Sequence, residues 1–387
     1  MRKIFQKTSI AALATFGMAT MAYAEDIKLP STIVWTAYNT GTSGYNQAVG
    51  IGSVIKNKYG TNLRVIPGKN DVSRLSPVKS GVAQFSATGS DSIYAQEAVY
   101  VFGTDNWGPQ PIRLIMHNLA DGCAASLVTA KDANIKTIPD LKGKRVAWVR
   151  GASSLNQAMT AYMAHANMTW DDVEKVEVGG YGASIDALIN NDLDALIGAT
   201  FSSTMRKIDA SPRGLYHPPA PHGDTEGWSR LNGIVPWYYK HLCMAGPGVP
   251  KEGYEGVGTG YPILVTTTKI SEDVAYNMTK AMYVHFDDYK DSAPGATGWA
   301  WERQKIEESF MPFHDGAVKY YKEAGHWTDK AQARQDANLK RQAVLMNAWE
   351  EYKKSAPSDD EGFNTGWMKA RADALKAEGM IPVFEKW

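Results

Sequence analysis

The chain has 387 residues with 41 basic and 41 acidic side chains. This balance argues against a nucleic-acid-binding protein, which would carry an excess of basic residues. The length predicts more than one domain, because a single hydrophobic core rarely grows beyond about 250–300 residues.

Residues 1–24 have the pattern of a cleavable export signal: a basic start, a short apolar stretch and the small-residue site Ala22-Tyr23-Ala24. Cleavage after Ala24 would remove three basic residues and no acidic one, so the net charge would fall from 0 to −3. No later segment has the roughly 20 apolar residues that span a bilayer. We therefore expect a soluble protein exported to the periplasm.

Between residues 27 and 100, short apolar runs alternate with helical patterns. The runs cover residues 33–38, 63–68 and 82–87, and Gly60 ends the first helical stretch as a C-cap. Strands separated by helices predict βαβ units in a parallel sheet.

Two apolar runs, residues 112–119 and 123–130, mark the place where the chain leaves the first unit. A second strand-helix alternation follows, whereas residues 212–260 are rich in Gly and Pro and are predicted to be irregular. A strand over residues 261–269 then returns to the first unit. We therefore expect a discontinuous first lobe (25–120 and 260–327), a second lobe (121–259) and a helical extension (328–387).

The clearest predicted helix covers residues 271–290, with Ser271 as its N-cap and an apolar stripe that includes Met278 and Met282. Residues 328–354 are also predicted to be helical. The role of residues 358–387 is left open by the sequence.

Four clusters of Gly, Ser and Thr each follow an apolar run and open into a helical pattern. They cover residues 40–45, 88–92, 151–154 and 198–203. Ligands of open α/β sheets bind at such strand ends, because unpaired backbone N–H groups and hydroxyls converge there. Each cluster taken alone is equally typical of an ordinary strand-helix turn with an N-cap.

No catalytic motif is present, so the sequence does not predict an enzyme, and no cofactor or metal is expected. The glycines of residues 256–260 precede a strand, whereas a dinucleotide-binding loop follows one. His217, His222 and Asp224 could hold a metal, but a structural role is favoured. Whether Cys123 and Cys243 form a disulfide or stay separate thiols is left open.

Three stretches carry a resemblance to a known family: residues 40–45 with Gly50, the pair Ser80-Gly81 with Ser90-Asp91, and residues 312–325 (PFHDGAVKYYKEAG). Over residues 33–327 the chain resembles the TAXI family of extracytoplasmic solute-binding proteins, the receptors of one branch of TRAP transporters. Residues 138–146 add a pattern shared by many binding-protein families.

The resemblance implies an α/β fold of the bilobal periplasmic-binding-protein-like type II, with two doubly wound domains joined by a hinge. It also implies capture of a small organic anion, such as glutamate or a related dicarboxylate, and delivery to a TRAP-type permease driven by an ion gradient. Asn46, Gly89 and Leu155 depart from the family pattern within the presumed cleft. The extension after Trp327 lies outside the resemblance.

We expect the ligand carboxylate at the start of the helix that opens at Ser153 and Ser154, because that end of a helix dipole favours negative charge. Arg150 could supply a bidentate contact or point into solvent. The other predicted ligand-binding residues are Thr42, Ser43, Tyr45, Ser90, Asp91, Thr200 and Phe201. Candidates for the cleft wall, each of which could equally be core, are Trp35, Tyr38, Trp148, Trp237 and Tyr238.

Two other functions stay open at this stage. A periplasmic enzyme on the same scaffold would need a nucleophile and a base facing each other across the cleft. A sensory binding module would use the segment after Trp327 to bind a partner. Turnover of a trapped ligand would distinguish an enzyme from a receptor. Measuring ligand affinity after deletion of the extension would distinguish a receptor from a sensory module.

Overall fold

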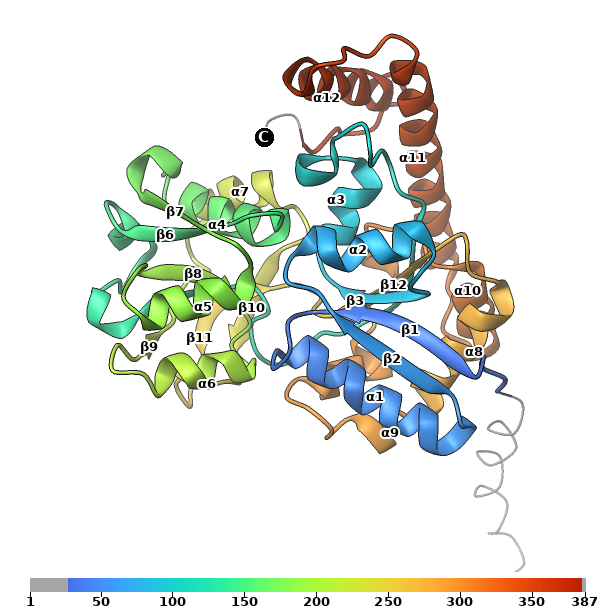
Figure 1. The fold of residues 1–387 in the computed structure, drawn as a ribbon, viewed down its shortest axis with the longest axis horizontal. Coiled ribbons are helices and arrows are strands. Elements are labelled where there is room, and N and C mark those ends of the chain that lie inside the picture. The colour runs from blue at the N-terminus through green and yellow to red at the C-terminus, as the bar shows by residue number, and fades with distance from the viewer. Residues whose placement is uncertain (1–26, 385–387) are drawn as a thin grey trace, which may run out of the picture.

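The computed structural model describes residues 27–384, so the expected signal sequence lies outside the described residues. Figure 1 shows two lobes side by side and a pair of helices that extends from one of them. We call the lobe that contains the first strands lobe 1 and its neighbour lobe 2. Within residues 27–384, no helix combines the length and the apolar character needed to cross a membrane.

The lobe 1 sheet has five strands, of which β1 is parallel to β2 and β3, while β12 is antiparallel to β3 and β4. In spatial order the strands are β2 (Asn62–Pro67), β1 (Thr32–Ala37), β3 (Phe85–Thr88), β12 (Ile263–Thr267) and β4 (Ile112–His117). The run predicted over residues 261–269 therefore does form a strand in the first sheet.

The lobe 2 sheet repeats this plan: β6 is parallel to β7 and β8, and β5 is antiparallel to β8 and β9. Its order is β7 (Glu174–Val178), β6 (Arg145–Val149), β8 (Ala195–Gly198), β5 (Ser126–Ala130) and β9 (Leu215–Tyr216). The parallel pairing predicted for the strands of residues 27–100 is confirmed. Both sheets are nevertheless mixed, because β12 and β5 add antiparallel strands. Each of these strands enters its sheet directly from the other lobe, without the crossover helix that a parallel strand requires.

Helices cover the sheets, and several of them begin at a side-chain cap. In lobe 1, Asn70 and Ser73 form a reciprocal capping box at the start of α2. The helices of lobe 1 are α1 (Ser43–Tyr59), α2 (Asp71–Ser80), α3 (Asp91–Glu97), α8 (Glu272–Val284), α9 (Phe286–Tyr289) and α10 (Asp315–Glu323), and those of lobe 2 are α4 (Ser153–His165), α5 (Tyr181–Ile189), α6 (Ser203–Asp209) and α7 (Thr225–Ile234).

Alternation along β6 sends side chains to both faces of the lobe 2 sheet. Val146 packs into one buried apolar cluster, whereas Ala147 and Val149 pack into the cluster on the other face. A sheet with two apolar faces needs helices on both. Lobe 2 is therefore a three-layer unit, as the strand-helix alternation of its sequence predicts.

Two predictions of local structure were wrong. The helix expected over residues 271–290 breaks at His285, which separates α8 from α9. The stretch 212–260 is not wholly irregular, because it contains α7 and the antiparallel hairpin of β10 (Tyr239–Cys243) and β11 (Tyr254–Gly258). Asp224, just after the prolines, caps α7 by accepting from the Gly227 N–H.

Cys123 and Cys243 form a disulfide with a Cα–Cα distance of 5.1 Å. It joins the first connection between the lobes, residues 118–125, to the end of β10. Gly256 of β11 lies against it, and a Cβ atom at that position would be 2.3 Å from the Cys243 sulfur. The glycine that resembled part of a nucleotide-binding loop is thus required by the disulfide beside it.

The C-terminal extension consists of α11 (Asp329–Lys353) and α12 (Asp360–Ala377), which pack on each other and on lobe 1 (Figure 1). Trp367 is fully buried and donates its indole N–H to the Ala98 carbonyl at the end of α3. Glu97 accepts from Arg341 of α11 and Arg371 of α12 in a buried ion cluster. The extension is therefore an integral part of lobe 1.

Candidate functional site

A narrow cavity of about 70 Å³ lies between the lobes. Lobe 1 contributes the end of β1, the start of α2 and the turn before α3, and lobe 2 contributes the starts of α4 and α5 and the end of β8. Its polar lining includes Tyr38, Lys69, Asp71, Arg74, Ser90, Ser154, Tyr181, Tyr238 and Tyr261. We call it the cleft cavity.

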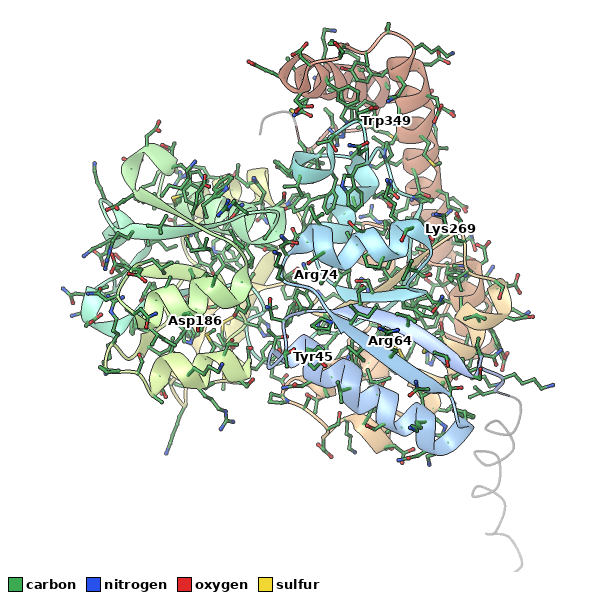
Figure 2. The ribbon with its side chains drawn as sticks, viewed as in Figure 1. Tyr45, Arg64, Arg74, Asp186, Lys269 and Trp349 are labelled. Carbon is green, nitrogen blue, oxygen red and sulfur yellow. A yellow bond between two sulfur atoms is a disulfide. The ribbon has the colours of Figure 1, made fainter. Side chains whose placement is uncertain are left out.

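The lobe 1 wall of the cleft cavity holds a buried ion cluster. Arg74 lies where the lobes meet (Figure 2), and its Nη2 is 2.7 Å from Asp71 Oδ1 and 3.0 Å from Asp91 Oδ2. The exposed fractions are 4% for Arg74, 1% for Asp71 and 0% for Asp91. The Arg74 guanidinium also lies 4.1 Å from the centre of the Tyr38 ring. Both carboxylates thus share one cation, which leaves the cluster a formal charge of −1 when both are ionised.

Asp71 also reaches across the cleft to lobe 2. Its Oδ2 accepts from the backbone N–H of Ser154 at 2.7 Å, and its Oδ1 accepts from the Ser154 hydroxyl at 2.8 Å. The residue at the N-cap of α4 is Ala152, whose side chain cannot accept a hydrogen bond. A carboxylate of the opposite lobe therefore binds the N–H group that a capping side chain would otherwise satisfy.

Burial and the nearby Asp91 raise the pKa of Asp71 to about 7, although Arg74 and Ser154 act in the opposite direction. Burial favours the neutral form because it removes the charged carboxylate from water. Asp71 is therefore a titratable contact between the lobes at neutral pH.

Backbone contacts flank this carboxylate contact. The Asp71 N–H donates to the Gly151 carbonyl at 3.0 Å, and the Tyr181 N–H donates to the Lys69 carbonyl at 3.1 Å. The Asn70 amide donates to the Arg150 carbonyl at 3.1 Å. The start of α2 is therefore hydrogen-bonded to the segments that begin α4 and α5, so the two lobes are closed on each other.

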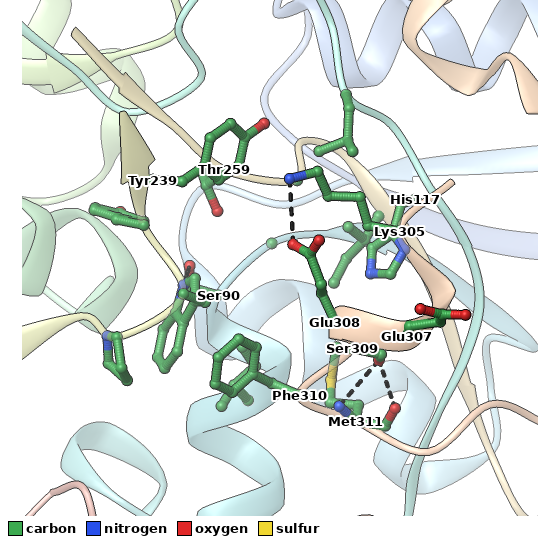
Figure 3. A pocket seen from close by; sticks show the side chains of 18 of the residues that line it. Ser90, His117, Tyr239, Thr259, Lys305, Glu307, Glu308, Ser309, Phe310 and Met311 are labelled. Atoms are coloured by element: carbon green, nitrogen blue, oxygen red, sulfur yellow. Dashed lines mark hydrogen bonds and ion pairs between the residues drawn. The ribbon is translucent and has the colours of Figure 1, made fainter. Parts of the chain in front are cut away.

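A larger cavity of about 480 Å³ lies on the other side of Ser90 and Tyr238, which line both cavities. Figure 3 shows it between residues 236–239 of lobe 2 and residues 305–311 of lobe 1. Lys330 and Arg334 of α11 complete its lining. We call this cavity the hinge-side pocket, because Leu119, Thr259 and Gly260 of the two connections also line it.

The structure brings part of the predicted lobe 1 set to the cleft. Ser90 lines both cavities and accepts from the Trp237 indole at 2.9 Å. Asp91 is fully buried, pairs with Arg74 and does not line the cleft cavity.

The other predicted lobe 1 residues lie at the start of α1. Thr42 caps α1 by accepting from the Tyr45 N–H, and Ser43 is buried in the first turn. Tyr45 lies at the end of α1 that faces lobe 2 but packs against the lobe 1 core (Figure 2).

Of the predicted lobe 2 residues, Ser154 lines the cleft cavity, whereas the buried Ser153 accepts from the Val101 N–H. The Arg150 side chain is exposed and does not line the cleft cavity. Thr200 donates to the Ala245 carbonyl, and Phe201 packs 6.1 Å from the Tyr261 ring, between the lobes.

Among the wall candidates, Tyr38, Trp237 and Tyr238 line one or both cavities. Trp35 is fully buried in the lobe 1 core, and Trp148 packs on Trp170 in lobe 2. Trp35 thus follows the core alternative, whereas Trp148 is half-buried and lines neither cavity.

Sequence reasoning missed Asp71, Arg74, Tyr181 and Tyr261. Asp71 and Arg74 are three residues apart on one helix, a spacing that is common in exposed ion pairs. An aspartate at the start of a helix also has an ordinary explanation in the helix dipole. Only the approach of lobe 2 distinguishes this pair from a surface pair.

His217, His222 and Asp224 do not come together as a ligand set. His217 bonds to Ser126 and to the Pro247 carbonyl, and His222 bonds to the Gly256 carbonyl. Among the described residues, no group of three His, Cys, Asp or Glu side chains could hold a metal ion.

A family model described as the NMT1-like family matches residues 36–325. Solved structures with similarity to the chain include three binding proteins. An amino acid ABC transporter substrate-binding protein from Streptococcus pneumoniae, bound to L-arginine, is 13% identical with a TM-score of 0.38, covering 80% of this chain and 95% of its own.

The periplasmic aliphatic sulphonate binding protein SsuA from Escherichia coli is 12% identical with a TM-score of 0.42, covering 91% of this chain and 89% of its own. A periplasmic binding protein from Brucella ovis with glutathione bound is 13% identical with a TM-score of 0.41, and the match covers 66% of this chain and 67% of that protein.

Proposed function

The chain belongs to the NMT1-like family, and we propose that it is an extracytoplasmic receptor that closes its two lobes over a small organic anion and delivers it to a membrane permease. The fold is the bilobal type II architecture, with two sheets of the same strand order joined by two connections. Such lobes can close around a ligand by rotation about the connections.

The single observation that carries this proposal is the contact between Asp71 and Ser154. A helix start in lobe 2 binds a carboxylate of lobe 1 through a backbone N–H and a hydroxyl. This is the chemistry that a carboxylate ligand would need at the same place. Asp71 thus supports the proposal as an internal counterpart of the ligand.

We propose that the ligand carboxylate takes the place of Asp71 at the start of α4. The ligand would be glutamate or a related dicarboxylate, and Lys69, which lines the cleft cavity, would supply a positive charge. Asp71 already accepts from both Ser154 donors. A ligand carboxylate at this place would therefore require that Asp71 withdraw.

The proposed residue set around the ligand remains the one expected from the sequence. Ser153, Ser154 and Arg150 would approach from one lobe with Thr200 and Phe201, and the lobe 1 set of Thr42, Ser43, Tyr45, Ser90 and Asp91 would lie opposite. Ser154 and Ser90 have the strongest support, because both line the cleft cavity.

The permease partner is proposed to be of the TRAP type, on the support of the sequence motifs alone. Export and processing after Ala24 are proposed from the signal pattern. N-terminal sequencing of the mature protein would test the processing, and uptake that continues in a permease deletion strain would contradict the partner.

Native mass spectrometry of the purified full chain, followed by a thermal-shift panel of carboxylates, tests the receptor function. A ligand at 100 times its dissociation constant should stabilise the folded state by about 2.7 kcal/mol. Steady consumption of a bound carboxylate by the protein alone would contradict a receptor and favour an enzyme.

A further inference from the structure

The hinge-side pocket has a charge pattern that leaves one cation unpaired. Its charged lining consists of Lys305, Lys330, Arg334, Glu307 and Glu308. Lys305 pairs with Glu308 at 3.2 Å (Figure 3), and Lys330 pairs with Glu307 at 2.9 Å. Among the described residues, no ion pair joins Arg334 to a carboxylate. The pocket therefore has a net charge of +1, located on a guanidinium.

Arg334 is held in place by contacts that leave most of its donors available. Its Nε donates to the Ser309 carbonyl at 2.7 Å, and its guanidinium carbon lies 5.3 Å from the centre of the Phe310 ring. A guanidinium has five N–H donors in a planar fork that matches a carboxylate. The terminal N–H groups of Arg334 make no hydrogen bond with the described residues, so they could form a bidentate contact with a carboxylate.

Aromatic side chains line the same pocket. The Trp237 ring lies 5.6 Å from the Phe310 ring, and the Lys305 ammonium lies 4.3 Å from the Tyr239 ring. Burial and the nearby Lys305 lower the pKa of His117 to about 4, so this lining residue adds no charge at neutral pH. The volume of about 480 Å³ falls in the range of small-molecule sites.

From this geometry we infer that the hinge-side pocket is a second small-molecule site, which binds an aromatic monocarboxylate with its carboxylate on Arg334 and its ring against Trp237 and Tyr239. A monoanion matches the single unpaired cation, whereas the second charge of a dianion would be repelled by Glu307 and Glu308. The site goes beyond the proposed receptor function, because it does not use the start of α4.

The second site depends on the C-terminal extension. Lys330 and Arg334 belong to α11, which begins at Asp329, after the end of the family match at residue 325. Residues 236–239 come from lobe 2, so the pocket is complete only when the lobes are closed. An occupant would therefore favour the closed form of the receptor.

Isothermal titration of the full chain with indole-3-acetate and phenylacetate tests the inference, with succinate as the aliphatic comparison. We expect Arg334→Gln to weaken indole-3-acetate binding about tenfold or more, the loss of a hydrogen bond to a charged group. Lys340→Gln, on the same helix but paired with Glu378, is the matched control and should bind as the wild type does.

A variant that is expected to strengthen binding distinguishes an effect on the pocket from misfolding. Glu307→Gln removes a negative charge from the pocket and should strengthen indole-3-acetate binding several-fold. Ser154→Ala removes one hydrogen bond between the lobes but no group that lines the hinge-side pocket, so it should weaken indole-3-acetate binding much less than Arg334→Gln does.

Absence of indole-3-acetate and phenylacetate binding to the wild type would overturn the second site, as would equal affinities for the wild type and Arg334→Gln. Neither result bears on the cleft, which the carboxylate panel and Ser154→Ala test independently. Binding lost in Ser154→Ala but kept in Arg334→Gln would likewise overturn the assignment to the hinge-side pocket.

Discussion

The Asp71 carboxylate of lobe 1 accepts hydrogen bonds from the backbone N–H and the hydroxyl of Ser154 in lobe 2, at 2.7 and 2.8 Å. Closed lobes thus place an internal anion at the helix start where the sequence predicts the anion of the ligand. Competition between the two anions leads to the first predictions.

Asp71→Asn should bind the carboxylate found in the thermal-shift panel about tenfold more tightly than the wild type. The ligand no longer has to displace a charged hydrogen-bond partner from Ser154. Calorimetric titration at pH 7 measures the change. Asp186→Asn, an exposed aspartate on α5, is the control and should leave the affinity unchanged. Weaker binding by Asp71→Asn would show instead that Asp71 contacts the ligand directly.

Ser154→Ala should weaken binding of the same carboxylate by about ten- to a hundred-fold, because one hydrogen bond to a charged group is lost. The fold should persist, which circular dichroism would verify. Unchanged affinity in this variant would place the ligand carboxylate elsewhere than at the start of α4.

The pH dependence of stability should carry a distinct contribution from Asp71. Its pKa is raised in the folded state to about 7, while the unfolded value is about 3.9. The folded state therefore binds more protons between these values, so the contribution of Asp71 to stability is greatest below about pH 4 and is lost as the pH rises to about 7.

Urea unfolding of the wild type and Asp71→Asn across pH 4–8 would isolate this contribution, because the other titrating groups are common to both proteins. We expect the stability of the wild type relative to Asp71→Asn to decline with rising pH over that range. A constant difference, or one that grows with pH, would contradict the raised pKa.

Reduction of the Cys123–Cys243 disulfide should lower the free energy of unfolding by about 2–5 kcal/mol, because the bond constrains a long stretch of the unfolded chain. Denaturant titrations with and without dithiothreitol measure the loss. The double variant Cys123→Ala, Cys243→Ala should show a similar loss and no further response to dithiothreitol. Equal stability of the oxidised and reduced wild type would contradict this prediction.

Glu97→Gln should destabilise the protein by about 3–5 kcal/mol, because it leaves the buried Arg371 without its charged partner. Lys369→Gln, which breaks an exposed pair with Asp373, should cost about 1 kcal/mol or less. Denaturant unfolding distinguishes the two. Similar small effects would mean that the extension is not held by the ion cluster at the end of α3.

Elements with caps and clear periodicity were predictable from the sequence. Thr42 and Ser271 mark the starts of α1 and α8, and Gly60 marks the end of α1, because caps are local interactions. The hairpin of β10 and β11 was not predictable, since Gly256 and its neighbours are typical of a loop until the disulfide is in place.

The candidate site was predictable only where it follows from the ends of strands. Ser90 and Ser154 follow strands that a βαβ pattern identifies, so both could be placed near the cleft. Asp71 and Arg74 gain their importance from contacts between residues far apart in sequence, such as Asp71 with Ser154, which no local pattern records. The contribution of Arg334 to a pocket similarly depends on how α11 packs on lobe 1.

The position of β12 in the lobe 1 sheet has a consequence for how the protein is made. Among the strands of residues 27–384, β12 is the one that pairs with β4, and it begins at Ile263, whereas the whole lobe 2 sheet is contained in residues 126–216. During synthesis, the lobe 2 sheet can form while the lobe 1 sheet still lacks a central strand. The lobe 1 sheet therefore stays incomplete until most of the chain has been made, and until then β3 and β4 have unpaired edges that could join another chain.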